Sequence, residues 1–233
     1  MAWAQDIIVV DSFSTDETLA ILAGFKNVRV YQRTFDNHAN QWNYALQETA
    51  IQTEWVLALD SDYILTDECI NEIKKIDPLQ DYSGYRISFR YCVFGKPLRG
   101  SLYPAVTVLF RTISANYIQD GHTQRVQIEG KIGSMDAFIL HDDRKPLSRW
   151  LKEQKKYMTL EANIIFNTPV NKLNWPDKAR KLLIIAPPLT FFYCVFIKKG
   201  FLDGWAGFYY AMQRTITEMI LSIELIKLLV KKN

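Results

Sequence analysis

Cysteine is scarce in this chain of 233 residues. Its three cysteines, Cys69, Cys92 and Cys194, are odd in number, widely separated and form no Cys-x-x-Cys pair. This distribution argues against a disulfide framework and against a structural zinc site. It suits a protein of a reducing compartment.

A strong excess of either charge is also lacking. The chain has 28 lysines and arginines against 25 aspartates and glutamates, which gives a formal net charge of +3 at pH 7. It contains no arginine-rich strip and no repeat in which aromatic and basic residues alternate, so nucleic acid is not an expected partner. The length suffices for one well-buried domain with an appendage.

Long hydrophobic runs are absent as well. The longest uncharged run, Leu182 to Ile197, is interrupted by Pro187 and Pro188. It is shorter than the roughly 20 residues that a membrane-spanning helix needs. We therefore expect it to lie in a membrane interface or to pack on the domain. The first six residues have neither a basic region nor a long apolar stretch, so they do not predict a signal peptide.

The first third of the chain alternates between apolar runs and helical patterns. Ile7–Val10 and Val28–Tyr31 are predicted strands, and predicted helices follow them at about 15–23 and 37–50. The run from Trp55 to Leu59 is typical of a strand that is buried on both faces of a sheet. The alternation predicts an α/β fold with a parallel, doubly wound sheet.

The rest of the chain changes character. After a helix at about 66–76, alternating patterns at 85–91, 106–110 and 125–128 predict half-buried strands of a mixed or antiparallel sheet. A helix through about 166 follows, and 203–230 is predicted to be one long amphipathic helix. We expect the apolar stripe of that helix to pack against the domain. Proline, asparagine and lysine accumulate near 167–176, so we place a domain at 1–166 and a C-terminal helical segment at 167–233.

Asp60-Ser61-Asp62 directly follows the third apolar run. In open α/β sheets, ligands bind at the carboxyl ends of the strands. Carboxylates on either side of a single residue can converge on one hard cation, and such a cation can hold a diphosphate. Short acidic triplets are common in loops, so the position after a strand is what makes this one a candidate site.

Three segments together resemble glycosyltransferase family 2. Val9 to Thr18 resembles its V-V-D-x-x-S-x-D-x-T signature, Gln41 to Leu46 resembles its asparagine-containing helix, and Trp55 to Asp62 resembles its apolar strand ending in D-x-D. The resemblance covers roughly residues 5–145. It is nearest to the subgroup that builds bacterial lipopolysaccharide core and related surface glycans.

This resemblance implies a GT-A fold, which is Rossmann-like, with a mostly parallel sheet, helices on both faces and amphipathic helices after it. It also implies an inverting transfer from a nucleotide-sugar donor, UDP-linked, assisted by a divalent cation, Mn²⁺ or Mg²⁺. The implied acceptor is a cell-envelope glycan or a lipid-linked molecule.

The resemblance also implies roles for single residues. Asp11 contacts the nucleoside, Asn43 lines the donor pocket, Asp60 approaches the ribose or the metal, and Asp62 is the direct metal ligand. Taken without it, Asp11 fits a helix-capping loop, and Asn43 fits a solvated helix position equally well.

The catalytic base is less well marked. Related enzymes often carry Gly-x-His-Glu where this chain has Gly121 to Gln124, and an amide cannot accept a proton. Asp120 is therefore the preferred base and His122 the second candidate. The alternative for this segment is a plain Asp-Gly turn.

A second ionisable group, His141 to Lys145, follows the apolar run that ends at Leu140. His141 is expected to complete the metal shell, as a late histidine does in many GT-A enzymes. Asp142 or Asp143 is expected to bind acceptor hydroxyls or to act as a rival base, and Arg144 and Lys145 to meet phosphate. The alternative is a solvated loop, the usual meaning of a run of charges.

The following helix has a basic face made of Arg149, Lys152, Lys155 and Lys156. Such a face is usually solvated, but its position before the Leu182 to Ile197 run favours contact with anionic lipid head groups. We expect a cytoplasmic protein held peripherally on the inner face of the cytoplasmic membrane.

Two further interpretations stay open. Family 2 enzymes ordinarily have another strand and helix before the strand that ends at Asp11, and only six residues precede Ile7 here. A missing central strand would leave the nucleoside pocket incomplete, which favours a non-catalytic GT-A module that binds a membrane partner. A haloacid dehalogenase-type phosphatase would also use D-x-D, but it leaves Asp11 to Thr18 without a role.

Overall fold

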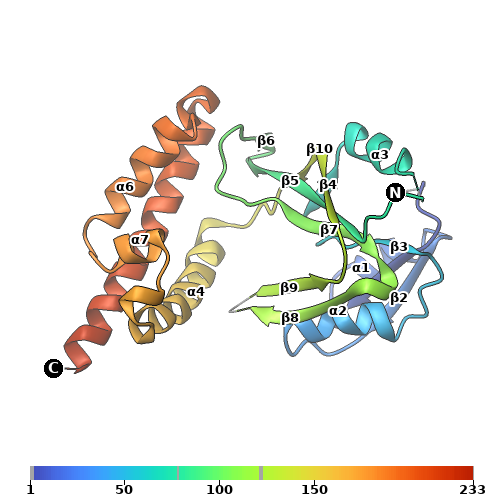
Figure 1. Cartoon of the computed structure of the whole chain (residues 1–233), viewed down its shortest axis with the longest axis horizontal. Helices are drawn as coiled ribbons and strands as arrows, with labels where there is room; N and C mark the ends of the chain where they lie inside the picture. The colour runs from blue at the N-terminus through green and yellow to red at the C-terminus, as the bar shows by residue number, and fades with distance from the viewer. Residues whose placement is uncertain (1–2, 78, 121–122, 233) are drawn as a thin grey trace. The chain divides into compact units, whose positions relative to one another are not determined.

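The computed structural model of the chain describes residues 3–77, 79–120 and 123–232 (Figure 1). The chain forms two compact units. The first unit contains Met1–Ala58, Leu79–Arg86 and Thr107–Ser134, and the second contains Leu59–Pro78, Ile87–Val106 and Met135–Asn233. The domain boundary predicted after residue 166 therefore falls inside the second unit.

The first unit begins with the predicted strand–helix–strand pattern. β1 (Ile7–Asp11) and β2 (Val28–Gln32) are joined through α1 (Thr18–Leu22) and pair in parallel, with Asp11 opposite Gln32. A parallel pair needs such a crossover connection. In the described part of the chain these two strands form a sheet of their own.

The third predicted strand differs from expectation in two ways. β3 (Trp55–Leu57) pairs antiparallel with β7 (Val106–Arg111), and its residues are half-buried, not buried on both faces. The reason is its place at the edge of the sheet, in which β3 is followed by β7, β5 (Gly84–Val93), β10 (Ile132–His141) and β4 (Tyr63–Leu65). The α/β class is confirmed, while the parallel pairing expected of this strand is wrong.

The core of the first unit lies between α2 (His38–Gln47) and the hairpin of β8 (Ala115–Asp120) and β9 (Thr123–Ile128) (Figure 1). Ala39, Ala58, Phe110 and Tyr117 are buried in it. Trp42 of α2 stacks on Tyr117 with 5.4 Å between ring centroids. A short 3₁₀ turn, η1 (Thr112–Ser114), leads from β7 into the hairpin.

The strands of the second unit include β4 (Tyr63–Leu65), most of β5 (Gly84–Val93) and β10 (Ile132–His141), and the short β6 (Lys96–Pro97). β4 pairs antiparallel with the end of β10. α3 (Asp67–Lys74) starts at Thr66, whose hydroxyl accepts from the N–H of Cys69 as an N-cap. The Glu72 carboxylate fastens this helix to β10 by accepting from the N–H groups of Asp136 and Ala137.

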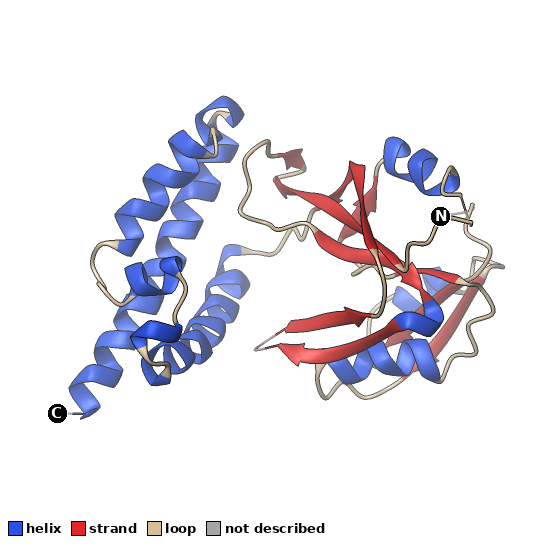
Figure 2. Ribbon diagram, in the orientation of Figure 1, coloured by secondary structure: helices blue, strands red, loops and turns tan. Residues whose placement is uncertain are grey.

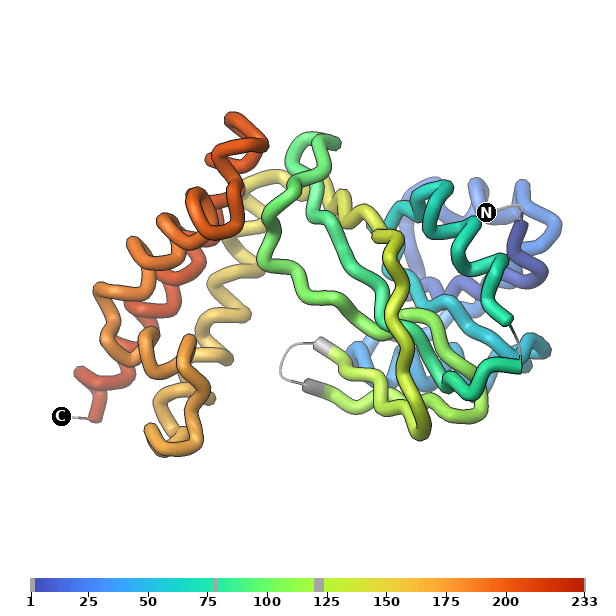
Figure 3. Tube along the Cα trace, turned by 45° about the horizontal axis from the view of Figure 1, so that its top comes forward, coloured from blue at the N-terminus to red at the C-terminus, as the bar shows by residue number. Residues whose placement is uncertain are grey.

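Helices make up the rest of the second unit (Figure 2). They are α4 (Leu147–Asn167), η2 (Val170–Lys172), α5 (Trp175–Arg180), α6 (Ala186–Phe192), the π-helical turn η3 (Tyr193–Ile197), η4 (Gly200–Asp203) and α7 (Trp205–Lys232). Both α4 and α6 lie along α7 (Figure 3). Among the helices of the described residues, none combines the length and the apolar character that crossing a membrane requires.

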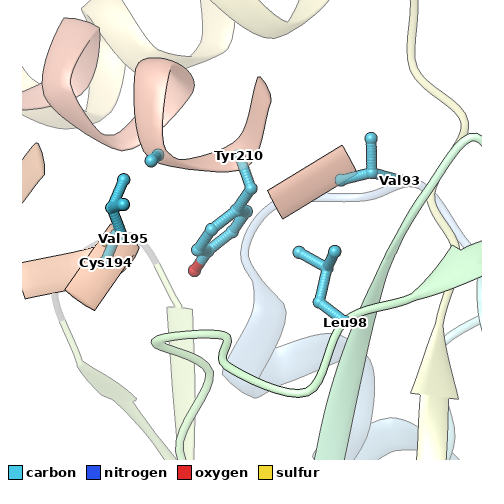
Figure 4. Packing of buried hydrophobic residues seen from close by; sticks show 6 residues of the cluster. Val93, Leu98, Cys194, Val195 and Tyr210 are labelled. Carbon is cyan, nitrogen blue, oxygen red and sulfur yellow. The ribbon is translucent and has the colours of Figure 1, made fainter. Parts of the chain in front are cut away.

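The segment after β5 joins these helices through a buried cluster (Figure 4). Val93 and Leu98 pack there with Cys194, Val195 and Tyr210. The Tyr210 hydroxyl accepts from the N–H of Leu102 at 2.8 Å, and the buried Asp203 accepts from the N–H of Arg99 at 2.9 Å. Residues on both sides of position 166 are therefore parts of one packed structure.

α7 has the predicted length, but its buried face is not the predicted one. The residues that it buries are Gly207, Tyr210, Ala211, Thr217, Glu218, Leu221, Ser222, Glu224 and Leu225. The helical spacing predicts a buried stripe of Trp205, Phe208, Tyr209, Met212, Ile216, Met219, Ile220 and Ile223. Most of it is exposed instead, namely Trp205, Phe208, Met212, Met219 and Ile223. Specific contacts outweigh the hydrophobic pattern: Glu218 forms an ion pair with Arg180 of α5 at 2.8 Å, and Ser222 donates to the carbonyl of Leu183.

The close approach of α7 to η4 requires a glycine. A Cβ atom on Gly207 would lie 2.0 Å from the backbone oxygen of Gly200. We expect Gly207→Ala to lower the free energy of unfolding by about 1–3 kcal/mol, because the extra methyl group meets backbone and not a flexible side chain. Chemical denaturation would measure the change, and an unchanged midpoint would contradict this packing.

Candidate functional site

Asp11 ends β1 as predicted, and its buried carboxylate is held by its own loop. The carboxylate accepts from the N–H and the hydroxyl of Ser14, and from the Gln32 side chain at 3.2 Å. The Ser14 hydroxyl is the main cause that lowers the pKa of Asp11, so the group is ionised at neutral pH. These contacts hold the carboxylate within its own loop and against β2, and they do not cap α1. The predicted contact of Asp11 with a nucleoside remains a prediction.

Asp62 lies against His141, although 79 residues separate them in the chain. Asp62 Oδ2 is 3.2 Å from His141 Nε2, within hydrogen-bonding distance. The antiparallel pairing of β4 with β10 places Tyr63 opposite His141, and the N–H of Asp142 donates to the Asp62 carbonyl at 3.0 Å. Two residues that the sequence assigned separately to a metal are thus brought side by side.

The electrostatics of the pair favour an ionised Asp62. Burial raises the pKa of this carboxyl, but the hydrogen bond and the charge of His141 outweigh burial, and the pKa is lowered. Lys145 contributes in the same direction. Asp60, by contrast, is exposed, and its carbonyl accepts from the N–H of Tyr63 at 3.1 Å. Asp60 thus lies in the same turn as Asp62 but is more exposed to solvent.

Three tyrosines surround His141 edge-on, a group that we call the tyrosine frame: Tyr63, Tyr91 and Tyr103. Their ring centroids lie 5.1, 5.3 and 4.9 Å from that of His141. The hydroxyls of Tyr63 and Tyr103 are 2.8 Å apart, and burial raises the pKa of all three phenols. The frame therefore holds the imidazole with neutral groups. No local sequence pattern marks this frame, because β4, β5 and the segment after β6 meet only in the folded chain.

Asp142 and Asp143 are not solvated, which contradicts the solvated-loop alternative for both of them. The Asp142 side chain is 4% exposed: Oδ2 accepts from Arg144 at 2.7 Å, while Oδ1 is buried with no hydrogen-bond partner in the described structure. Asp143 accepts from the Tyr91 hydroxyl at 3.1 Å and lies 3.5 Å from Lys145 Nζ. Asp143 is therefore linked to His141 through a tyrosine of the frame.

The positively charged side chain of Lys145 is part of this site. Its Nζ lies between Asp143 and Glu153 of α4, 3.4 Å from the latter. Burial lowers the pKa of Lys145, but the charges of Asp143 and Glu153 outweigh burial and raise it. Arg144 is exposed apart from its bond to Asp142, so of the two predicted phosphate-binding residues Lys145 is the one built into the structure.

The remaining candidates belong to the first unit. The Asn43 amide forms two hydrogen bonds with the backbone of Tyr117. Its Nδ2 donates to the carbonyl and its Oδ1 accepts from the N–H, both at 2.8 Å. The role of Asn43 in a donor pocket remains a prediction. Asp120 ends β8, but its side chain is outside the description, and His122 lies outside the described residues.

A divalent cation could bind at Asp62 and His141 only if substrate phosphates complete its coordination shell. Within residues 3–77, 79–120 and 123–232, no group of three or more histidine, cysteine, aspartate or glutamate side chains is placed to hold an ion. Asp62 and His141 offer two donors. Mg²⁺ is commonly held by one or two carboxylates together with substrate phosphates, so the pair fits a cation whose shell a diphosphate completes.

Comparison with known proteins finds a family match in the N-terminal part of the chain. Residues 4–98 match the family model of glycosyl transferase family 2, and we call them the family 2 segment. Asp11, Asn43, Asp60 and Asp62 all lie in this segment.

A curated relative supports the assignment. Over 82 residues the chain is 34% identical to an uncharacterized glycosyltransferase of Rickettsia bellii (strain RML369-C). The alignment covers 35% of this chain and 27% of the relative, so the chain spans about a quarter of the relative that it matches.

Solved structures of S. aureus TarS (residues 1–349) are similar at a lower level. The complex with UDP-GlcNAc has 18% sequence identity and a TM-score of 0.46, over 92% of this chain and 72% of TarS. The complex with UDP has 17% identity and a TM-score of 0.44, over 96% and 82%. The family assignment rests on the sequence match and not on these likenesses.

Substitution of Asn43 tests whether its two hydrogen bonds to Tyr117 serve stability or nucleotide binding. We expect Asn43→Ala to lower the free energy of unfolding by about 1–3 kcal/mol, because the partly buried N–H and carbonyl of Tyr117 lose their partner. Asn40→Ala, on the same helix but with an exposed amide, is the matched control, with a change within about 0.5 kcal/mol. Unchanged stability together with lost nucleotide affinity would point to the donor pocket instead.

Proposed function

We propose that this chain transfers a sugar, with inversion, from a UDP-linked donor to a hydroxyl group of a cell-envelope glycan or lipid-linked acceptor. The family 2 segment supports sugar transfer and a nucleotide-sugar donor. The observation that carries the assignment to this site is the contact of Asp62 with His141 inside the tyrosine frame. An ionised carboxylate and an imidazole held this firmly are preorganised to receive a cation.

Asp62 and His141 would hold a divalent cation, Mn²⁺ or Mg²⁺, at the diphosphate of the donor. The cation, when bound, neutralises the charge that develops on the departing nucleoside diphosphate. As the family resemblance implies, Asp60 would approach the ribose and Asp11 would contact the nucleoside. The tyrosine frame fixes the orientation of the imidazole.

The transfer also needs a base. The acceptor oxygen attacks the anomeric carbon, the bond from that carbon to the diphosphate oxygen breaks, and a carboxylate takes the proton of the acceptor hydroxyl. We assign this role to Asp143, because its contact with Tyr91 ties it to the His141 site. Asp142 is the weaker candidate, since its carboxylate is almost fully buried beside Arg144.

The setting that we propose is the inner face of the cytoplasmic membrane. A lipid-linked acceptor is presented there, and a protein that uses it gains from a peripheral attachment. No nucleic-acid partner is proposed.

Nucleotide binding tests the site directly. We expect UDP with Mn²⁺ to raise the thermal unfolding midpoint, because a ligand present at about 100 times its Kd stabilises the folded state by roughly 2.7 kcal/mol. Asp62→Asn should remove the part of this shift that depends on Mn²⁺. Asp81→Asn is the matched control, because Asp81 is exposed and pairs only with the exposed Lys131 among its described contacts.

The same titration separates the alternatives. Stabilisation by UDP that is independent of Mn²⁺ in the wild type would contradict the cation assignment. No stabilisation by any nucleotide, with or without metal, would contradict the transferase and favour a non-catalytic module that binds a membrane partner.

Substitution of the three carboxylates among the candidate bases tests the chemistry. We expect Asp143→Asn to lower kcat by about 10²- to 10⁴-fold with little change in donor KM, because an amide cannot accept the proton. Asp142→Asn should change kcat much less. If Asp120→Asn abolishes turnover while Asp143→Asn remains near wild type, the base is Asp120, as the sequence first suggested.

A further inference from the structure

The exposed side of α7 is an apolar stripe that runs the length of the helix. Its members are Trp205, Phe208, Met212, Met219, Ile223, Ile226 and Val230, all exposed. At 3.6 residues per turn they fall within a sector of about 60°, opposite the residues that α7 buries. Both glutamates of the helix, Glu218 and Glu224, are on the buried side. The helix therefore presents its most hydrophobic face to its surroundings.

Aromatic residues extend this stripe across α6 and η3. Phe192 stacks on Phe196 with 6.0 Å between ring centroids, and both are exposed. Phe191, next to Phe192, contacts Phe208 at 5.4 Å, and Phe208 contacts Trp205 at 5.9 Å. The rings thus form one continuous series, which together with the stripe we call the aromatic surface.

The hairpin between β5 and β6 adds its tip to the aromatic surface. Phe94 and Gly95 both have positive φ, 52° and 76°, as a tight two-residue turn requires. This turn leaves Phe94 84% exposed while its ring contacts Tyr209 of α7 at 5.1 Å. An open, mainly apolar pocket of about 530 Å³ lies among Phe94, Trp205, Phe208 and Met212.

The charges around the aromatic surface are almost all positive. Lys198 and Lys199 follow η3, and Lys96 lines the pocket. Segments 93–106 and 182–217 contain one carboxylate in total, Asp203, and it is buried against the N–H of Arg99. A surface of exposed tryptophan, phenylalanine and lysine without accessible carboxylates is complementary to an apolar layer that has an anionic edge.

We infer that the aromatic surface docks on an anionic lipid bilayer, with Phe94 and Trp205 entering the head-group region and α7 lying in the membrane plane. Burial of apolar side chains drives the contact, and the lysines add attraction to lipid phosphates. The idea that this docking brings the site to a lipid-linked acceptor rests on the proposed function. The lipid binding itself does not.

Vesicle co-sedimentation of the whole chain, without nucleotide, tests the inference. We expect binding to vesicles of phosphatidylcholine and phosphatidylglycerol in a two-to-one ratio, and much weaker binding to phosphatidylcholine alone. Phe94→Ser with Trp205→Ser should reduce the partition coefficient at least about tenfold, because two aromatic anchors are removed. Lys198→Gln with Lys199→Gln should reduce it for the anionic vesicles only.

The control is Trp175→Ser, since Trp175 of α5 is 83% exposed against 85% for Trp205 and is outside the aromatic surface. It should bind vesicles as the wild type does. Equal binding by the double aromatic variant, or no binding to anionic vesicles by the wild type, overturns the inference. A wild-type dimer in sedimentation velocity that Trp205→Ser dissociates, without vesicle binding, would instead show an interface between copies.

The outcome is independent of the sugar-transfer proposal. Thermal shift with UDP and Mn²⁺ on the same variants should be unchanged, because none of the substituted residues touches Asp62 or His141 in the described structure. If the protein binds nucleotide but not lipid, the docking proposal is contradicted and the transferase proposal stands. If it binds lipid but not nucleotide, the transferase proposal is contradicted and the docking proposal stands.

Discussion

The contact between Asp62 and His141 is the interaction on which the candidate site depends. It exists because β4 pairs with the end of β10, which sets Tyr63 opposite His141 and leaves Asp62 just before the paired strand. The tyrosine frame then fixes the imidazole from three sides. A slip of the β4 register by one residue would turn Tyr63 to the other face of the sheet and break the contact.

The sequence predicted those parts of the fold that local patterns determine. The apolar run before Asp11 marks β1, and the long helical repeat marks α7, because both patterns depend on side-chain spacing within one segment. It also selected Asp62 and His141 for one metal shell, through the family resemblance, but no pattern in it indicated the strand pairing that brings them within 3.2 Å. That proximity, like the tyrosine frame, comes from strand pairing between distant segments.

The orientation of α7 shows why hydrophobic periodicity alone can choose the wrong face. Periodicity predicts that the apolar stripe is buried. The helix instead buries a mixed face, in which small and polar residues lie beside Tyr210, Leu221 and Leu225. Gly207 permits a close approach, and Glu218 and Ser222 find partners in neighbouring segments. The apolar face is left outward, and it is part of the aromatic surface that we infer docks on lipid.

Pulsed electron paramagnetic resonance of Mn²⁺ bound with UDP tests the cation site most directly. If His141 is a ligand, the spectrum of the wild type contains a coupling to imidazole nitrogen, and His141→Gln lacks it. The variant is needed because the chain has three histidines. A wild-type spectrum without nitrogen coupling, or a coupling that survives His141→Gln, would contradict the assignment of Asp62 and His141 as the pair that holds the cation.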